Sequence, residues 1–247
     1  MNRTILYKLH LWLSLPLGIF VTLICLSGAT LVFKNEIRQA LGMPRVVAPH
    51  GGHHAADKDA PHASATKRIV GIDGTTSRHA HSSQSAVPSH SAEKVGPTTT
   101  KRDFFSYVTR FHTSFMMGKV GKWVVTYTTL LFVFILVSGM AVCWPRSRSQ
   151  WRQRLKVARG KGRRRLFYDL HVSLGYWVVL WLVLLAVTGA AFGLHLLPRG
   201  SAAIKVFHEL HVGAWGGVVT KIITFVVSLI GASLPLTGYY LYYKKYR

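Results

Sequence analysis

Hydrophobic residues are concentrated in four long runs, which alternate with polar or basic stretches. The runs are Leu11–Phe33, Trp123–Trp144, Leu174–Leu197 and Ile222–Tyr243, and none of them contains Asp, Glu, Lys or Arg. A bilayer core of about 30 Å needs roughly 20 apolar residues in helical form, because lipid cannot satisfy exposed backbone groups. The pattern predicts an all-α membrane protein with four transmembrane helices.

The first run follows the basic residues Arg3 and Lys8, which is also how a signal peptide begins. Its apolar stretch is too long for a signal peptide, however, and Ser27-Gly28-Ala29-Thr30 continues into further apolar residues without a cleavage site. We expect this run to be a retained membrane anchor.

The charged residues lie outside the runs and predict the orientation. The chain has 247 residues and a net charge of +23, and the segment Pro145–Leu170 alone carries ten lysines and arginines against one acid, Asp169. The positive-inside rule places the N-terminus, this segment and the C-terminus in the cytoplasm. A nucleic-acid-binding role for the basic segment is the alternative. Because topology and attraction to anionic lipid already explain the charge, we expect a lipid membrane as partner and no nucleic acid.

The segment between the first two runs has a different composition. Residues 44–102 are rich in Ser, Thr, Ala, Gly, Pro and His, which predicts a flexible periplasmic loop. Its seven histidines indicate either weak capture of a transition metal or a polar filler. They are His50, His53, His54, His62, His79, His81 and His90. The predicted organisation is the first transmembrane helix (1–43), this loop (44–102), a periplasmic histidine segment with the second helix (103–145), a basic cytoplasmic loop (146–170), and the third and fourth helices (171–247).

An internal repeat relates the two halves of the chain. The interval from histidine to glycine is 18 residues for His10–Gly28 and for His171–Gly189, and 27 residues for His112–Gly139 and for His211–Gly238. The second pair agrees further, because a glycine and a lysine follow each histidine after six and ten residues (Gly118 and Lys122; Gly217 and Lys221). The chain is therefore predicted to consist of two helical hairpins of the same topology, which makes them parallel repeats.

Parallel repeats place equivalent residues at equal depth. His10 and His171 should share the cytoplasmic side, and His112 and His211 the external side. Imidazole is a common axial ligand of haem iron, and helical bundles hold cofactors between facing helices. Two opposed histidines give a six-coordinate haem that passes electrons without activating oxygen. The pattern thus favours two haems, one per leaflet, over histidines that merely lie at the membrane interface.

Several neighbouring residues take part in this hypothesis. Eighteen residues are five helical turns, or about 27 Å, so Gly28 should lie on the face of His10 and leave room for the external porphyrin. Gly139 and Gly238 are interpreted as helix-packing residues. His112 and His211 precede their apolar runs by about eleven residues, so the glycines between are expected to break the helix and fold the histidine segment back.

Four further residues are weaker candidates. His195, whose repeat counterpart is Lys34, and His208, one turn before His211, are alternative ligands. Lys122 and Lys221 are expected either to neutralise haem propionates or to extend to the interface.

The chain resembles the PepSY-associated transmembrane proteins. Leu9-His10-Leu11-Trp12 and the segment 27–37 are similar to the opening helix of that family, and Phe111-His112-Thr113 and 237–242 are similar to its later helices. The family includes bacterial inner-membrane haem proteins that reduce ferric siderophores. The resemblance implies haem b as cofactor, with His10, His112, His171 and His211 at the family's histidine positions. The loop 44–102 replaces the folded PepSY domain of larger members.

The resemblance implies an oxidoreductase that reduces ferric siderophore to Fe(II) in the periplasm for iron uptake. Because no glycine-rich nucleotide fingerprint is present, the electron donor is expected to be a quinol or a separate reductase. A permease for iron chelates or metal, and a cofactor-free assembly or regulatory partner, are the alternatives.

Overall fold

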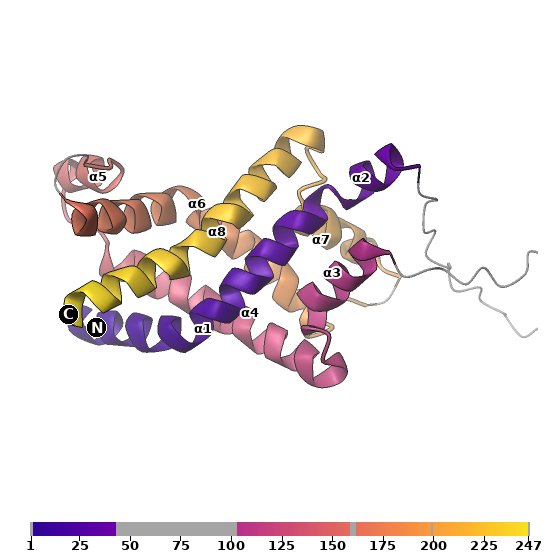
Figure 1. The fold of residues 1–247 in the computed structure, drawn as a ribbon, viewed down its shortest axis with the longest axis horizontal. Coiled ribbons are helices and arrows are strands. Elements are labelled where there is room, and N and C mark those ends of the chain that lie inside the picture. The colour runs from indigo at the N-terminus through magenta and orange to yellow at the C-terminus, as the bar shows by residue number, and fades with distance from the viewer. Residues whose placement is uncertain (1, 43–102, 159–161, 199, 247) are drawn as a thin grey trace, which may run out of the picture. The chain divides into compact units, whose positions relative to one another are not determined.

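The computed structural model describes residues 2–42, 103–158, 162–198 and 200–246, and these residues form helices and their connections (Figure 1). The predictions for the loop 44–102, including its seven histidines, lie outside the described residues. The helices are α1 (Arg3–Val32), α2 (Lys34–Ala40), α3 (Phe104–Ser114), α4 (Gly118–Val142), α5 (Arg148–Arg154), α6 (Arg163–Gly193), α7 (Ala202–Val212) and α8 (Gly217–Tyr246).

The four predicted transmembrane helices are confirmed. Helices α1, α4, α6 and α8 are each long enough to cross a bilayer, and their mean hydropathy lies between 1.9 and 2.2. Large apolar side chains on their outer faces are exposed, with Trp177 at 70% and Leu180 at 83%. Such exposure is costly in water and favourable in lipid, so it fits a bundle surrounded by acyl chains.

The basic segment is more structured than a loop. Helix α6 begins at Arg163, directly after Gly162 with its positive φ of 85°, so the arginine-rich residues before His171 belong to the helix. Arginine and lysine favour helix as readily as leucine does, so α6 extends beyond its apolar run on the N-terminal side. Helix α6 also ends at Gly193, earlier than the predicted run, and His195 has a φ of 55°.

The predicted breaks before the second and fourth membrane helices are confirmed. Between α3 and α4 the chain turns through left-handed residues, Phe115 at φ 45° and Gly118 at φ 62°. Between α7 and α8, Gly213 and Gly217 have φ of 71° and 70°. Glycine adopts this conformation without steric cost, which explains why the turns lie at these positions. Each break allows the preceding short helix to fold back against the bundle.

The membrane helices form a four-membered ring. Helix α1 packs against α4 and α8, and α6 packs against the same two helices, so α1 and α6 are diagonal to each other. The core between them contains Val21, Phe132, Leu182 and Val227. Both termini and α5 lie at one end of the bundle, which we call the termini end, and α2, α3 and α7 lie at the opposite, loop end (Figure 1).

Ion pairs hold the short helices at the loop end. Arg38 of α2 pairs with Asp103, the N-cap of α3, and Lys221 of α8 pairs with Glu36 of α2. The hydrogen bond from Ser106 lowers the pKa of Asp103, and the hydrogen bond from Lys221 lowers the pKa of Glu36. Both carboxylates are therefore stabilised in the charged form and tie α2 to its neighbours.

Candidate functional site

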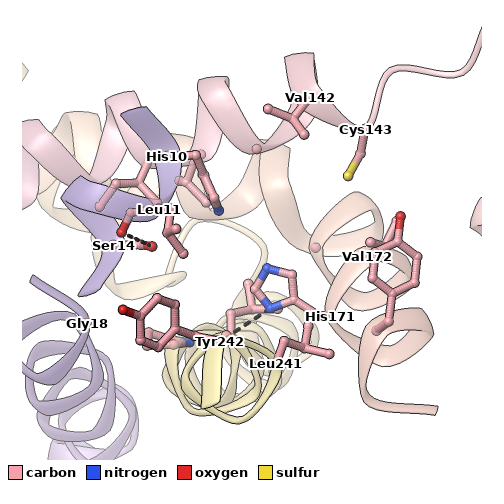
Figure 2. Close-up of a pocket in the computed structure, with 18 of the residues that line it drawn as sticks. His10, Leu11, Ser14, Gly18, Val142, Cys143, His171, Val172, Leu241 and Tyr242 are labelled. Carbon is pink, nitrogen blue, oxygen red and sulfur yellow. Dashed lines mark hydrogen bonds between the residues drawn. The ribbon is translucent and has the colours of Figure 1, made fainter. Parts of the chain in front are cut away.

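A cavity of about 830 Å³ lies between the four membrane helices in the termini-end half of the bundle. His10 of α1 and His171 of α6 project into it toward each other (Figure 2). Because α1 and α6 are diagonal in the ring, the two imidazoles approach the cavity from opposite sides. The volume is that of a pocket for a cofactor-sized molecule. Its walls are mainly apolar and include Leu11, Val21, Phe132, Leu136, Val179 and Leu234.

Cationic side chains line the same cavity. They are Arg154 of α5, Arg164 and Arg165 of α6, and Lys245 of α8. The Arg154 guanidinium donates to the Tyr168 hydroxyl at 2.7 Å, so it is held at the edge of the cavity. An apolar chamber with cations on its wall suits a flat hydrophobic molecule that carries carboxylates, which is the chemistry of haem.

The second histidine pair lies at the loop end. The ring centroids of His112 in α3 and His211 in α7 are 6.2 Å apart, with 52° between the ring planes. A ligating imidazole nitrogen lies about 2 Å from a metal and the ring centre roughly 1 Å beyond it, so two rings on opposite sides of one ion have centroids about 6 Å apart. The spacing of His112 and His211 therefore fits two axial ligands of a single iron.

Each of the four imidazoles is held in the same way by a different helix. In each case Nδ1 lies at hydrogen-bond distance from the hydroxyl of a Ser/Thr–Gly pair, by which we mean a serine or threonine followed by glycine. The distances are 3.1 Å for His10 to Ser138, 3.0 Å for His112 to Ser27, 2.9 Å for His171 to Thr237 and 2.9 Å for His211 to Thr188.

A backbone carbonyl one turn earlier in the same helix also faces each Nδ1. The carbonyls of Ile135, Ile24 and Leu234 lie 3.0, 3.1 and 3.1 Å from the Nδ1 atoms of His10, His112 and His171 respectively. The Leu185 carbonyl takes this place for His211.

These contacts determine which nitrogen carries the proton. The Ser138 hydroxyl donates its only hydrogen to the Ile135 carbonyl at 3.0 Å, and the Thr237 hydroxyl donates to the Leu234 carbonyl at 2.8 Å. Ser27 and Thr188 donate to carbonyls in the same manner. A carbonyl has no hydrogen to give, so each imidazole Nδ1 must be the donor. The neutral ring then has its lone pair on Nε2, the nitrogen that is available to a metal.

The glycine of each pair lies against the imidazole, and at three of the four positions a Cβ would crowd the ring. A Cβ added at Gly139 would lie 3.0 Å from Cε1 of His10, and one at Gly28 would lie 3.1 Å from Cε1 of His112. At Gly189 the distance to His211 would be 3.0 Å, and at Gly238 the distance to His171 would be 3.7 Å.

This arrangement corrects two interpretations of the glycines. The open face of Gly28 is filled by the His112 ring, rather than left for a porphyrin. Helix packing is an incomplete account of Gly139 and Gly238, because both lie against the imidazoles at the termini end. Gly139 and Gly238 each follow a loop-end histidine by 27 residues, but each lies against a termini-end histidine, His10 and His171 respectively.

Burial favours the neutral form of the two imidazoles of the loop-end pair. It lowers the pKa of His112, and it lowers the pKa of His211 to about 4, with a smaller contribution from the neighbouring His112. Both rings are therefore neutral at physiological pH, which is the form that ligates metal.

The weaker candidates do not join either pair. His195 is exposed and its Nε2 contacts the Lys122 ammonium. His208 is exposed on α7, one turn before His211. Lys122 contacts His195, and Lys221 contacts Glu36. Neither protein partner was predicted, because both lysines were expected either to neutralise haem propionates or to extend to the interface.

Each pair offers a metal two protein ligands and no more. Among the described residues, no group of three or more His, Cys, Asp or Glu side chains is placed to hold a metal ion. Protein sites for a bare zinc or iron use three or four such ligands. Two opposed imidazoles suit an iron whose other four ligands come from a macrocycle, as in haem.

Sequence reasoning identified the four histidines but assigned no role to the hydroxyls of Ser27, Ser138, Thr188 and Thr237. The signal was present, because a Ser-Gly or Thr-Gly pair recurs near the end of every apolar run. The arginines at the cavity were interpreted only through the topology, because the sequence does not show that α5 and the start of α6 approach the cavity of His10 and His171.

A family model described as PepSY-associated TM region matches residues 7–203 and 195–245 of the chain. The two matches together cover all four membrane helices and both histidine pairs. No curated protein and no solved structure matches the chain.

Proposed function

The chain belongs to the PepSY-associated transmembrane family, and we propose that it is a di-haem b protein of the bacterial inner membrane that reduces ferric siderophore in the periplasm. The observation that carries the proposal is the presence of two opposed imidazole pairs at two levels of one bundle. A permease would not need its histidines in opposed pairs, whereas the pairing at two levels suits two metal centres that each take two imidazole ligands.

The residues of the chain have separate tasks in this function. His10 and His171 would hold the haem at the termini end, and Arg154 and Arg164 would attract its carboxylates. His112 and His211 would hold the second haem. A haem with two imidazole ligands supplies one-electron transfer without an open coordination position. His10 and Ser27, which contacts the second pair, are about 26 Å apart along α1, so the two sites lie in opposite halves of the bundle.

The direction of electron flow follows from charge and orientation. The arginines of α5 and the start of α6 lie at the termini end, and the positive-inside rule supports our proposal that this end faces the cytoplasm. A quinol or a separate reductase would then supply electrons to the His10 site, and the His112 site would deliver them outside. One electron converts the bound Fe(III) of the chelate to Fe(II), which siderophores hold weakly.

The proposal is tested by mixing dithionite-reduced protein with ferric siderophore under anaerobic conditions. We expect the haem absorption bands to return to their oxidised positions while ferrozine captures one Fe(II) per electron. Protein that is purified without haem, or reduced haem that ferricyanide oxidises but ferric siderophore does not, would refute the function.

Single-site variants separate the two haems. His171→Ala should lose the termini-end haem and keep the loop-end haem, so that the pre-reduced protein still reduces the chelate in detergent. In liposomes the same variant should fail to pass electrons from a reductant inside to a chelate outside. His112→Ala should fail in both assays. Loss of neither haem in these variants would show that the pairing is wrong.

A further inference from the structure

We propose that the hydroxyls of the four Ser/Thr–Gly pairs are positioning residues that fix each imidazole with Nε2 toward the cofactor and set the donor strength of the ligand. This inference rests on the proposed function, because it concerns how the same histidines bind haem. The residues are Ser27, Ser138, Thr188 and Thr237.

The same geometry occurs four times on four different helices. Each hydroxyl accepts from a histidine of a neighbouring segment, at 2.9 to 3.1 Å. The histidines themselves come from two membrane helices, α1 and α6, and from two short helices, α3 and α7. Helix packing alone would not repeat one side-chain contact in such different settings. A shared chemical requirement of the imidazoles explains the repetition.

The hydroxyl offers Nδ1 a second acceptor beside the backbone carbonyl. A carbonyl inside an α-helix already accepts the N–H of the residue four positions later. The Ile135 carbonyl also accepts from Ser138, so it is shared among several donors. The Ser138 oxygen has lone pairs that no backbone group uses, and its hydrogen is directed away by the bond to Ile135. It therefore receives the Nδ1–H of His10 without competition.

The glycine next to the hydroxyl leaves space for the imidazole ring. The added Cβ positions at Gly139, Gly28 and Gly189 lie within 3.0 to 3.1 Å of a ring carbon, so any larger residue would push the ring away from the hydroxyl. At these three pairs, serine or threonine followed by glycine thus supplies an acceptor and a gap at neighbouring positions.

A purely structural role for these hydroxyls is the competing explanation. Serine and threonine in apolar helices commonly donate to a carbonyl three or four residues earlier and need no further partner. Ser233 in α8 and Thr129 in α4 do this, donating to Ile230 at 2.7 Å and to Val125 at 2.8 Å. They share helices with Thr237 and Ser138, and they form no hydrogen bond to a histidine of the described residues. They are therefore matched controls.

The expected consequence is electronic as well as structural. Donation from Nδ1 to an acceptor raises the basicity of a ligating imidazole, and loss of such a partner typically weakens metal binding about 10- to 100-fold. Ser138→Ala should therefore release the termini-end haem faster and raise its midpoint potential, because a weaker donor stabilises Fe(III) less. Ser138→Thr restores the acceptor and should return both values to those of the wild type.

The experiment compares purified Ser138→Ala, Ser138→Thr, Thr129→Val and Ser233→Ala with the wild type by redox titration, by electron paramagnetic resonance of the oxidised haems, and by haem transfer to apomyoglobin. We expect the termini-end signal alone to shift in Ser138→Ala, and the other three variants to match the wild type. An unchanged potential, resonance spectrum and transfer rate in Ser138→Ala would overturn the inference.

Two further outcomes are informative. If Ser138→Ala does not fold, Ser27→Ala tests the same role at the loop end, where the loop-end signal should shift. Wild-type protein without haem would refute the proposed function itself. Wild-type protein with two haems and an unaffected Ser138→Ala variant would refute only the positioning role.

Discussion

The glycines beside the histidines allow a quantitative test with a built-in control. Gly139 and Gly238 occupy equivalent positions in the two hairpins and contact the two imidazoles of the same cavity. A Cβ at Gly139 would lie 3.0 Å from Cε1 of His10, whereas a Cβ at Gly238 would lie 3.7 Å from Cε1 of His171. Only the first is shorter than the optimal carbon–carbon separation of about 3.5–4.0 Å.

The expected magnitude follows from this difference. In Gly139→Ala the His10 ring must retreat by a few tenths of an ångström to regain an ordinary contact. Metal–ligand distances are defined to about 0.2 Å, so the shift exceeds what ligation tolerates. Overpacking of this kind costs about 1–3 kcal/mol, and at about 1.4 kcal/mol per tenfold the affinity for haem falls roughly 5- to 150-fold. Gly238→Ala requires no shift of the ring. Both substitutions gain about 0.5–1 kcal/mol of helix stability from the replacement of glycine by alanine.

The assay is the number of haems per chain after purification, together with the rate at which haem is lost to apomyoglobin. We expect Gly139→Ala to retain the loop-end haem and to lose much of the termini-end haem, and Gly238→Ala to keep both. Equal behaviour of the two variants, whether both lose the haem or both keep it, would refute the assignment of Gly139 as the close neighbour of a ligand.

The ion pairs and the cavity cations give the remaining predictions. Asp103→Asn removes the carboxylate that pairs with Arg38 and should loosen α3, so that the loop-end haem is lost faster at pH 7 while the termini-end haem is unaffected. Because the pKa values of Asp103 and Glu36 are lowered, their stabilising contribution is complete above the ordinary pKa range of the two carboxyls and is lost as the pH falls through their lowered folded-state pKa values. An acid titration of protein that carries only the loop-end haem should show this loss, and Asp103→Asn should flatten it. Arg154→Gln should weaken haem binding in the termini-end cavity about two- to fivefold, whereas Arg148→Gln on the same helix, outside the cavity lining, should leave it unchanged.

The sequence was informative wherever local chemistry decides the structure. The four apolar runs required membrane helices. Gly118 and Gly217, each six residues after a histidine, marked the breaks that fold α3 and α7 back. The parallel repeat predicted which histidines lie at the same depth. The contact between His112 and His211 confirms this pairing at the loop end.

The sequence did not predict the features of the site that depend on tertiary contacts. It does not specify how helices rotate against each other, so the partner of His10 was not predicted to be the Ser138–Gly139 pair of α4. It also does not show where the basic segment lies in space. Arginines such as Arg154 satisfy the positive-inside rule wherever they are at that membrane face, and their place at the cavity depends on the packing of α5 against α6.

An experimental density map of the purified protein in a membrane mimetic tests the central claim most directly. We expect one flat macrocycle between His10 and His171 and another between His112 and His211, with an Nε2 atom on each side of both irons. Continuous protein packing between either pair, or imidazoles that turn away from each other with no macrocycle between them, would contradict the electron-transfer function and leave only the four-helix fold.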